Sequence, residues 1–99
     1  MSDLVDRARD ALKSVVDPEA GLNIVDLGLV YDVAVENGRL VALITFTTEA
    51  CPVGPRLAAE AERALAAVAG PAPVEIRVTF DPPWTPERIT PDGRALLGR

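Results

Sequence analysis

Apolar residues recur every three or four positions along the first segment of the chain, which is the spacing of one face of an amphipathic helix. This pattern runs from Asp3 to Val16, and Pro18 prevents its continuation. The same spacing returns after position 54 on a second set of apolar residues: Leu57, Ala58, Ala61, Leu65 and Val68. Gly70 and Pro71 then end the pattern. The sequence therefore predicts two amphipathic helices.

Between the two helices the period changes to two, which is typical of strands with one face in the core. The first such run extends from Leu29 to Glu36. It assigns Tyr31, Val33 and Val35 to one face and its acidic side chains to the other. The dipeptide Asn37-Gly38 follows, and these residues readily adopt the two positive-φ positions of a type I′ turn. A second β-rich run begins directly after the turn, so the sequence predicts a hairpin.

The second strand of the hairpin is expected over residues 39–47, and a third strand over residues 74–80, where apolar and polar side chains again alternate. The predicted helix between them is a crossover that makes these two strands parallel and places both helices on one side of the sheet. The expected fold class is α/β (α+β). It is a two-layer sandwich in the order α-β-β-α-β, with a small three-stranded sheet and the helices on one face.

The C-terminal segment from Asp81 to Pro86 is too rich in proline for pairing in a sheet, and we expect it to run extended. Thr90 can cap a short C-terminal helix that Pro91 begins. The chain has 99 residues, 48% of them hydrophobic, and no internal repeat, so we expect residues 1–99 to form a single domain.

The charge balance limits the classes of partner. Charged residues make up 25% of the chain, and the net charge is -5 at pH 7, so no basic stripe is available for a phosphate backbone. We therefore expect no nucleic-acid partner. The N-terminus lacks the basic and apolar regions of a signal peptide, and the chain contains no run of about 18 apolar residues. We expect a cytoplasmic protein without a membrane partner.

Cys51 is the only cysteine of the chain and lies on the loop between the second strand and the second helix. A single cysteine forms no internal disulfide, which leaves a buried filler thiol, a reactive thiolate or a metal ligand. A helix N-terminus lowers a thiol pKa and so favours the thiolate. The chain has no histidine, which excludes a Cys-His or Ser-His catalytic pair, and we do not expect an enzyme.

Several polar residues are candidates for a site around this cysteine. Thr45, Thr47 and Thr48 provide hydroxyls that can hydrogen-bond a sulfur or a bound ligand, although β-propensity alone explains threonines in this run. Asp26 lies in an apolar stretch. Two interpretations of Asp26 are open. It forms an Asx-type turn, in which backbone N–H groups hold the carboxylate, or it lines the site.

Trp84, the only tryptophan, lies in the stiff proline-flanked segment together with Pro83. Such a segment suits either a lid packed over the core or an exposed anchor for a partner protein. The sequence leaves both interpretations open.

Four segments, taken in order, resemble the SufT and PaaD type of metal-sulfur cluster assembly domain. They are Asp17-Pro18-Glu19, Ile24-Val25-Asp26-Leu27-Gly28-Leu29-Val30-Tyr31-Asp32-Val33, Thr47-Thr48-Glu49-Ala50-Cys51-Pro52 and Asp81-Pro82-Pro83-Trp84-Thr85-Pro86. The resemblance covers nearly the whole chain. Two departures stand out: Ala50 replaces a usual glycine, and Arg88 and Ile89 stand where a methionine is common.

The resemblance implies an α/β fold, a role in iron-sulfur protein maturation and Cys51 as the functional residue, with Asp26, Thr47 and Thr48 near it. It also implies partners, namely apo iron-sulfur client proteins and the cluster assembly machinery or a P-loop ATPase carrier. This chain has no Gly-x-x-x-x-Gly-Lys motif of its own, so any ATPase is a separate protein.

Iron-sulfur clusters take about four thiolate ligands, so one cysteine per chain cannot complete the coordination shell. Either Cys51 is a transient metal ligand, shared between the subunits of a homodimer or with small thiols or a client, or no cluster is held. In the second case the chain is a non-ligating adaptor, such as a PaaD-like accessory subunit of a ring-oxygenase system, which binds its target through Trp84 and Pro83.

Overall fold

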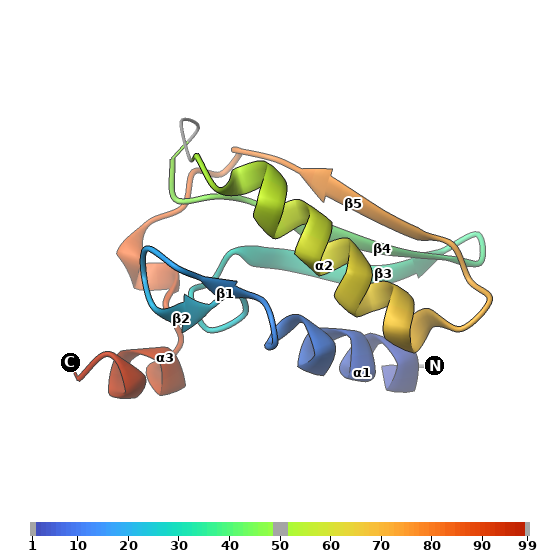
Figure 1. Ribbon diagram of the computed structural model, residues 1–99, viewed down its shortest axis with the longest axis horizontal. Coiled ribbons are helices and arrows are strands. Elements are labelled where there is room, and N and C mark those ends of the chain that lie inside the picture. Colours follow the sequence, from blue (N-terminus) through green and yellow to red (C-terminus); the bar gives the residue numbers. More distant parts are fainter. Residues whose placement is uncertain (1, 49–51, 99) are drawn as a thin grey trace.

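The computed structural model describes residues 2–48 and 52–98 of the chain. These residues form three α-helices, a short 3-10 helix and two small sheets, arranged as in Figure 1. In chain order the elements are α1 (Ser2–Leu12), β1 (Val16–Asp17), β2 (Leu22–Asn23), β3 (Val30–Glu36), β4 (Arg39–Ile44), α2 (Gly54–Ala69), β5 (Val74–Val78), η1 (Pro86–Arg88) and α3 (Pro91–Leu96). The mixed α+β fold class predicted from the hydrophobic pattern is confirmed.

The main sheet has the strand order β3-β4-β5. Strands β3 and β4 pair antiparallel across the predicted turn, in which Asn37 has φ 53° and Gly38 has φ 77°. Positive φ at both positions is what a type I′ turn requires, so the hairpin is confirmed. Strands β4 and β5 are parallel, with α2 as the connection between them.

The core lies between this sheet and the two long helices, which pack side by side on the same face of the sheet (Figure 1). Alternate residues of β4 point toward the helices and are fully buried: Leu40, Ala42 and Ile44. The helices contribute the facing residues Ala8, Leu12, Leu57, Ala61 and Leu65. Each large aliphatic side chain buried in this way contributes about 1.5–3 kcal/mol. The two-layer arrangement predicted from the periodicity is therefore confirmed.

The opposite face of the sheet carries a charged network instead of a helix. Arg77 lies 3.4 Å from Glu36 and 2.6 Å from Glu75, and Arg39 lies 3.6 Å from Glu75. The hydrogen bond from Arg77 lowers the pKa of Glu75. Val41 is on this face between Ala34 of β3 and Glu75 of β5, and it is only 4% exposed.

The first helix is shorter than its apolar pattern predicts, since it ends at Leu12 instead of reaching Val16. The Ser14 hydroxyl donates a 2.7 Å hydrogen bond to the Ala11 carbonyl oxygen and so satisfies one acceptor at the helix end. Val16 instead pairs with Asn23 in the two-stranded β1–β2 sheet. Two-residue strands are too short to show a period, so the hydrophobic pattern could not predict them.

One face assignment on β3 is wrong. A bulge between Val30 and Asp32 places two residues of β3 opposite one of β4, so Tyr31 does not share the core face with Val33. The described part of β4 is also shorter than expected and ends at Ile44. Beyond these changes the predicted helix α2 and the parallel strand β5 are present.

The C-terminal tail, residues 79–98, follows the prediction. Residues 79–85 belong to no helix or strand, and α3 begins at Pro91. The Thr90 hydroxyl accepts a 2.9 Å hydrogen bond from the Gly93 backbone N–H, which is the expected N-cap. The one-turn helix η1 was not predicted. Among the described residues, no helix combines the length and the apolar character needed to cross a membrane.

Candidate functional site

Several elements of the described chain converge at one end of the main sheet. The C-terminal ends of β4 and β5, the N-terminal end of β3 and the first turn of α2 all lie there, at the left of Figure 1. Two backbone hydrogen bonds extend the sheet past its strands at this end. Thr45 N–H donates to the Leu29 carbonyl oxygen at 2.8 Å, and Thr79 N–H donates to the Ile44 carbonyl oxygen at 2.9 Å.

An aromatic pair lies at this end of the sheet, and one of its two rings packs against the start of α2. The rings of Phe46 and Phe80 have their centroids 6.2 Å apart. A Cβ atom placed on Gly54, the first residue of α2, would lie 2.9 Å from the Phe46 ring. Only a glycine therefore allows this close packing of the first residue of α2 against the Phe46 ring.

The first turn of α2 has no negative group of its own. Val53 occupies the N-cap position without a side-chain hydrogen bond, and the first turn contains no acidic residue. The partial positive charge of the helix N-terminus is therefore not offset within the described part of this turn. Cys51 precedes Gly54 by three positions in the sequence. Together with Glu49 and Ala50, Cys51 lies outside the described residues.

The three threonines flank the end of β4. Thr45 is fully buried, and its hydroxyl donates a long hydrogen bond of 3.4 Å to the Phe46 carbonyl oxygen. Thr47 is half-buried and Thr48 is exposed. The structure thus positions these residues on the segment that leads to Cys51, and their role toward a sulfur or a ligand stays a prediction.

Asp26 is buried, 8% exposed, and among the described residues its carboxylate bonds to side chains, not to the backbone N–H groups that the Asx-turn interpretation predicts. One carboxylate oxygen accepts from the Asn23 side-chain amide at 2.8 Å and the other accepts from the Thr90 hydroxyl at 3.0 Å. The Asn23 side-chain oxygen accepts from the Asp26 N–H at 2.9 Å. Asp26 therefore joins the β2–β3 loop to the cap of α3, and sequence spacing alone could not identify Thr90 as its partner.

Two glycines allow the tail to approach this loop. A Cβ atom on Gly28, which has φ +79°, would overlap the backbone carbonyl of Arg88. A Cβ atom on Gly93 would lie 2.9 Å from the Asp26 carbonyl oxygen. The loop and the tail therefore pack backbone against backbone at both points.

Trp84 completes the junction between loop and tail. Its indole Nε1–H donates a 2.7 Å hydrogen bond to the Leu27 carbonyl oxygen, and its half-buried ring packs against the core. Close by, the Tyr31 hydroxyl donates to the Pro82 carbonyl oxygen at 2.8 Å. Pro83 is exposed. This geometry fits the lid interpretation of Trp84, whereas contact of Trp84 or Pro83 with a partner stays a prediction.

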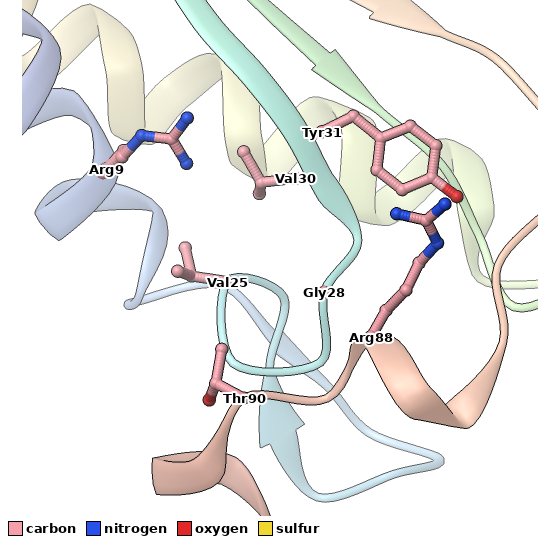
Figure 2. A pocket seen from close by; sticks show the side chains of 7 residues that line it. All are labelled: Arg9, Val25, Gly28, Val30, Tyr31, Arg88 and Thr90. Atoms are coloured by element: carbon pink, nitrogen blue, oxygen red, sulfur yellow. The ribbon is translucent and has the colours of Figure 1, made fainter. Parts of the chain in front are cut away.

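A depression of about 340 Å³ lies beside the β2–β3 loop (Figure 2). Its lining residues are Arg9, Val25, Gly28, Val30, Tyr31, Arg88 and Thr90. Sequence analysis did not identify it, because its residues come from three distant segments. Among the residues that the structure describes, no group of three or more acidic, cysteine or histidine side chains is arranged to hold a metal ion.

Comparison with known proteins identifies the class to which this fold belongs. A family model described as iron-sulfur cluster assembly protein matches residues 6–78. The Fe-S protein maturation auxiliary factor YitW of Bacillus subtilis is 39% identical over 89 residues, which cover 89% of this chain and 87% of that protein. The Fe-S protein maturation auxiliary factor SufT of Staphylococcus aureus is 35% identical over 85 residues, 85% of this chain and 97% of that protein.

A crystal structure of a domain of unknown function from Bacillus anthracis has the same fold. It superposes with a TM-score of 0.88 at 32% sequence identity and covers 96% of this chain and 92% of that one. The chain is therefore a member of the iron-sulfur cluster assembly protein family. The resemblance drawn from the four sequence segments is confirmed at the level of the family.

Proposed function

We propose that this chain assists the maturation of iron-sulfur proteins by contacting a cluster, or a cysteine of an apo-client, through the thiolate of Cys51. The observation that carries the proposal is the family match over residues 6–78, a span that includes this cysteine. Two relatives that match along most of their length are named as Fe-S protein maturation auxiliary factors. The cluster is the cargo in this proposal.

The start of α2 supports the thiolate form. The helix begins three positions after Cys51, and its first turn carries neither an acidic residue nor a side-chain cap. An uncompensated helix N-terminus stabilises a nearby anion and lowers the pKa of a thiol. The chain has no histidine and no second cysteine to activate or resolve this thiolate, which favours an assembly factor over an enzyme.

One thiolate per chain requires help from outside the chain. A cluster has about four ligand positions, so the remaining ligands come from a second subunit, a small thiol or a client. Thr47 and Thr48 lie on the segment before Cys51, and we assign their hydroxyls to hydrogen bonds with a sulfur of the cargo. Asp26 serves the same site by holding the β2–β3 loop through Asn23 and Thr90.

The competing function is that of an adaptor without a ligand role for Cys51. In that case Trp84 and the exposed Pro83 would meet the target protein, and the cysteine would only fill space. The Trp84 indole N–H is already bonded to the Leu27 carbonyl oxygen, which favours the lid role for this side chain. We therefore place ligation by Cys51 ahead of the adaptor function.

Anaerobic reconstitution with iron and sulfide tests the proposal directly. Wild type and Cys51→Ala are compared by visible absorbance and native mass, and the transfer of a cluster to an apo-ferredoxin is measured in parallel. We expect absorbance from a cluster, together with the mass of a dimer or of a complex with a small thiol, for the wild type only.

A matched control keeps the number of thiols constant. The double variant Cys51→Ala/Ala95→Cys carries its one thiol on the exposed α3 helix, and it should behave like Cys51→Ala. Circular dichroism establishes that all variants are folded. Equal cluster transfer by wild type and a folded Cys51→Ser variant would contradict the proposal and leave the adaptor function.

A further inference from the structure

The depression beside the β2–β3 loop is lined by residues of α1, of the β2–β3 loop with the start of β3, and of the C-terminal segment. Figure 2 shows Arg9 on α1 at one side of it and Arg88 at the end of η1 on the other side, with Val25 and Val30 between them. Thr47 and Thr48 do not line it. The depression is therefore a second candidate site with its own chemistry.

Its charge is opposite to that of the whole chain. The chain has a net charge of -5, yet two arginines and no acidic side chain line the depression. Within residues 2–48 and 52–98, none of the ion pairs includes Arg9 or Arg88. Two arginines outside these ion pairs favour an anion as the ligand of the depression.

Arg88 is held in place without loss of its hydrogen-bonding capacity. Its guanidinium carbon lies 4.6 Å from the centroid of the Tyr31 ring. The Tyr31 hydroxyl is itself fixed by its bond to the Pro82 carbonyl oxygen, and Gly28 lets the Arg88 backbone pack closely. A stacked guanidinium keeps its N–H donors available for a planar carboxylate and loses little entropy on binding.

The rest of the lining is suited to a short apolar group. Val25 and Val30 supply aliphatic side chains, while the Thr90 hydroxyl is committed to Asp26 and the Gly93 N–H. We propose that the depression binds a small organic carboxylate with a short aliphatic stem, the carboxylate on Arg88 and the stem on the two valines, while Arg9 adds positive charge from the opposite side. This inference goes beyond cluster maturation, since nothing in it requires Cys51.

Chemical-shift titration of the full-length protein tests this inference with three probes. Isovalerate has both the carboxylate and the stem, isoamyl alcohol has only the stem, and inorganic phosphate has only the negative charge. We expect saturable shifts of the Val25 and Val30 methyl signals with isovalerate, and much weaker binding of the other two probes. Saturable binding of phosphate as tight as that of isovalerate would overturn the assignment of an aliphatic acid.

Two substitutions locate the binding. Arg88→Gln should weaken isovalerate binding by about tenfold, because it removes a charge-assisted hydrogen bond, and Arg9→Ala should weaken it by a smaller factor. Arg63→Ala removes a charge from the exposed face of α2 and should leave the affinity unchanged. Arg88→Gln changes a residue of the tail and could loosen the tail itself. Arg9→Ala avoids this effect, because Arg9 lies on α1. Unchanged affinity in a folded Arg9→Ala variant, or no saturable shift in the wild type, would overturn the inference.

Discussion

The indole Nε1–H of Trp84 donates a hydrogen bond to the carbonyl oxygen of Leu27, at 2.7 Å and across 57 positions of sequence. This bond joins two of the segments through which the chain resembles its family. The tail is thereby fastened to the loop that precedes β3, and the Asp26–Thr90 bond repeats the connection a few residues further along. Loop and tail form one structural unit at the end of the sheet.

Replacing Trp84 by phenylalanine should separate the packing of the ring from its hydrogen bond. Trp84→Phe keeps an aromatic side chain but leaves the Leu27 carbonyl oxygen without its partner, so we expect a loss of about 1–3 kcal/mol in unfolding free energy. Urea denaturation followed by circular dichroism measures it. Val35→Ala, at an exposed position of β3, is the control, and an equal loss in both variants would contradict the importance of the bond.

A methyl group at Gly28 should be much more harmful than one at Gly21. Both glycines have positive φ, +79° and +71°, so alanine is strained at either position. Only at Gly28 would the new Cβ overlap the Arg88 backbone, while Gly21 has nothing within 4 Å. We expect Gly21→Ala to cost about 1 kcal/mol. Gly28→Ala should lower the unfolding midpoint further and detach the tail.

Limited proteolysis provides the second measurement for this pair. Detachment of the tail exposes the segment after Asp81, so Gly28→Ala should be cleaved there faster than Gly21→Ala under native conditions. Equal stability and equal cleavage of the two variants would show that the Arg88 backbone does not need this close approach.

The Asp26 carboxylate and the Thr90 hydroxyl should be energetically coupled. Asp26→Ala leaves the Asn23 amide and the Thr90 hydroxyl without their acceptor in a buried setting, which costs about 1–3 kcal/mol. A double-mutant cycle with Thr90→Val isolates the pair. Asp32→Asn, an exposed carboxylate on β3, is the control. Fully additive losses in the cycle would contradict a direct bond.

The pKa of Glu75 should rise when Arg77 is replaced by leucine. The hydrogen bond from Arg77 lowers this pKa in the folded chain. A lowered pKa means that the interaction stabilises the fold above the unfolded-state pKa, and that this contribution is lost as the pH falls through the folded-state value. The pair is exposed, so the effect on stability is small.

Titration of the Glu75 carboxyl carbon by nuclear magnetic resonance measures this change. Arg56→Leu, which removes an exposed ion pair with Glu60 on α2, should leave the pKa of Glu75 unaltered. An unchanged titration in Arg77→Leu would show that the network on the open face of the sheet does not persist in solution.

The sequence by itself determined the order of the long elements, because helical and strand periods extend over enough residues to be read locally. It also determined the Asn37-Gly38 turn and the Thr90 cap, since both depend on the conformational preferences of one or two residues. The four motif segments gave the family, which the family match confirms.

Only the tertiary structure decided which distant groups meet. The bond between Thr90 and Asp26 joins segments far apart in the chain, and so does the bond between Trp84 and Leu27. The depression between Arg9 and Arg88 likewise combines distant segments. The bulge at Tyr31 and the early end of α1 were likewise set by pairing with other strands, against the local apolar pattern. Local periodicity reports which face of an element is buried, but a hydrogen-bond partner is chosen by the packing of the whole chain.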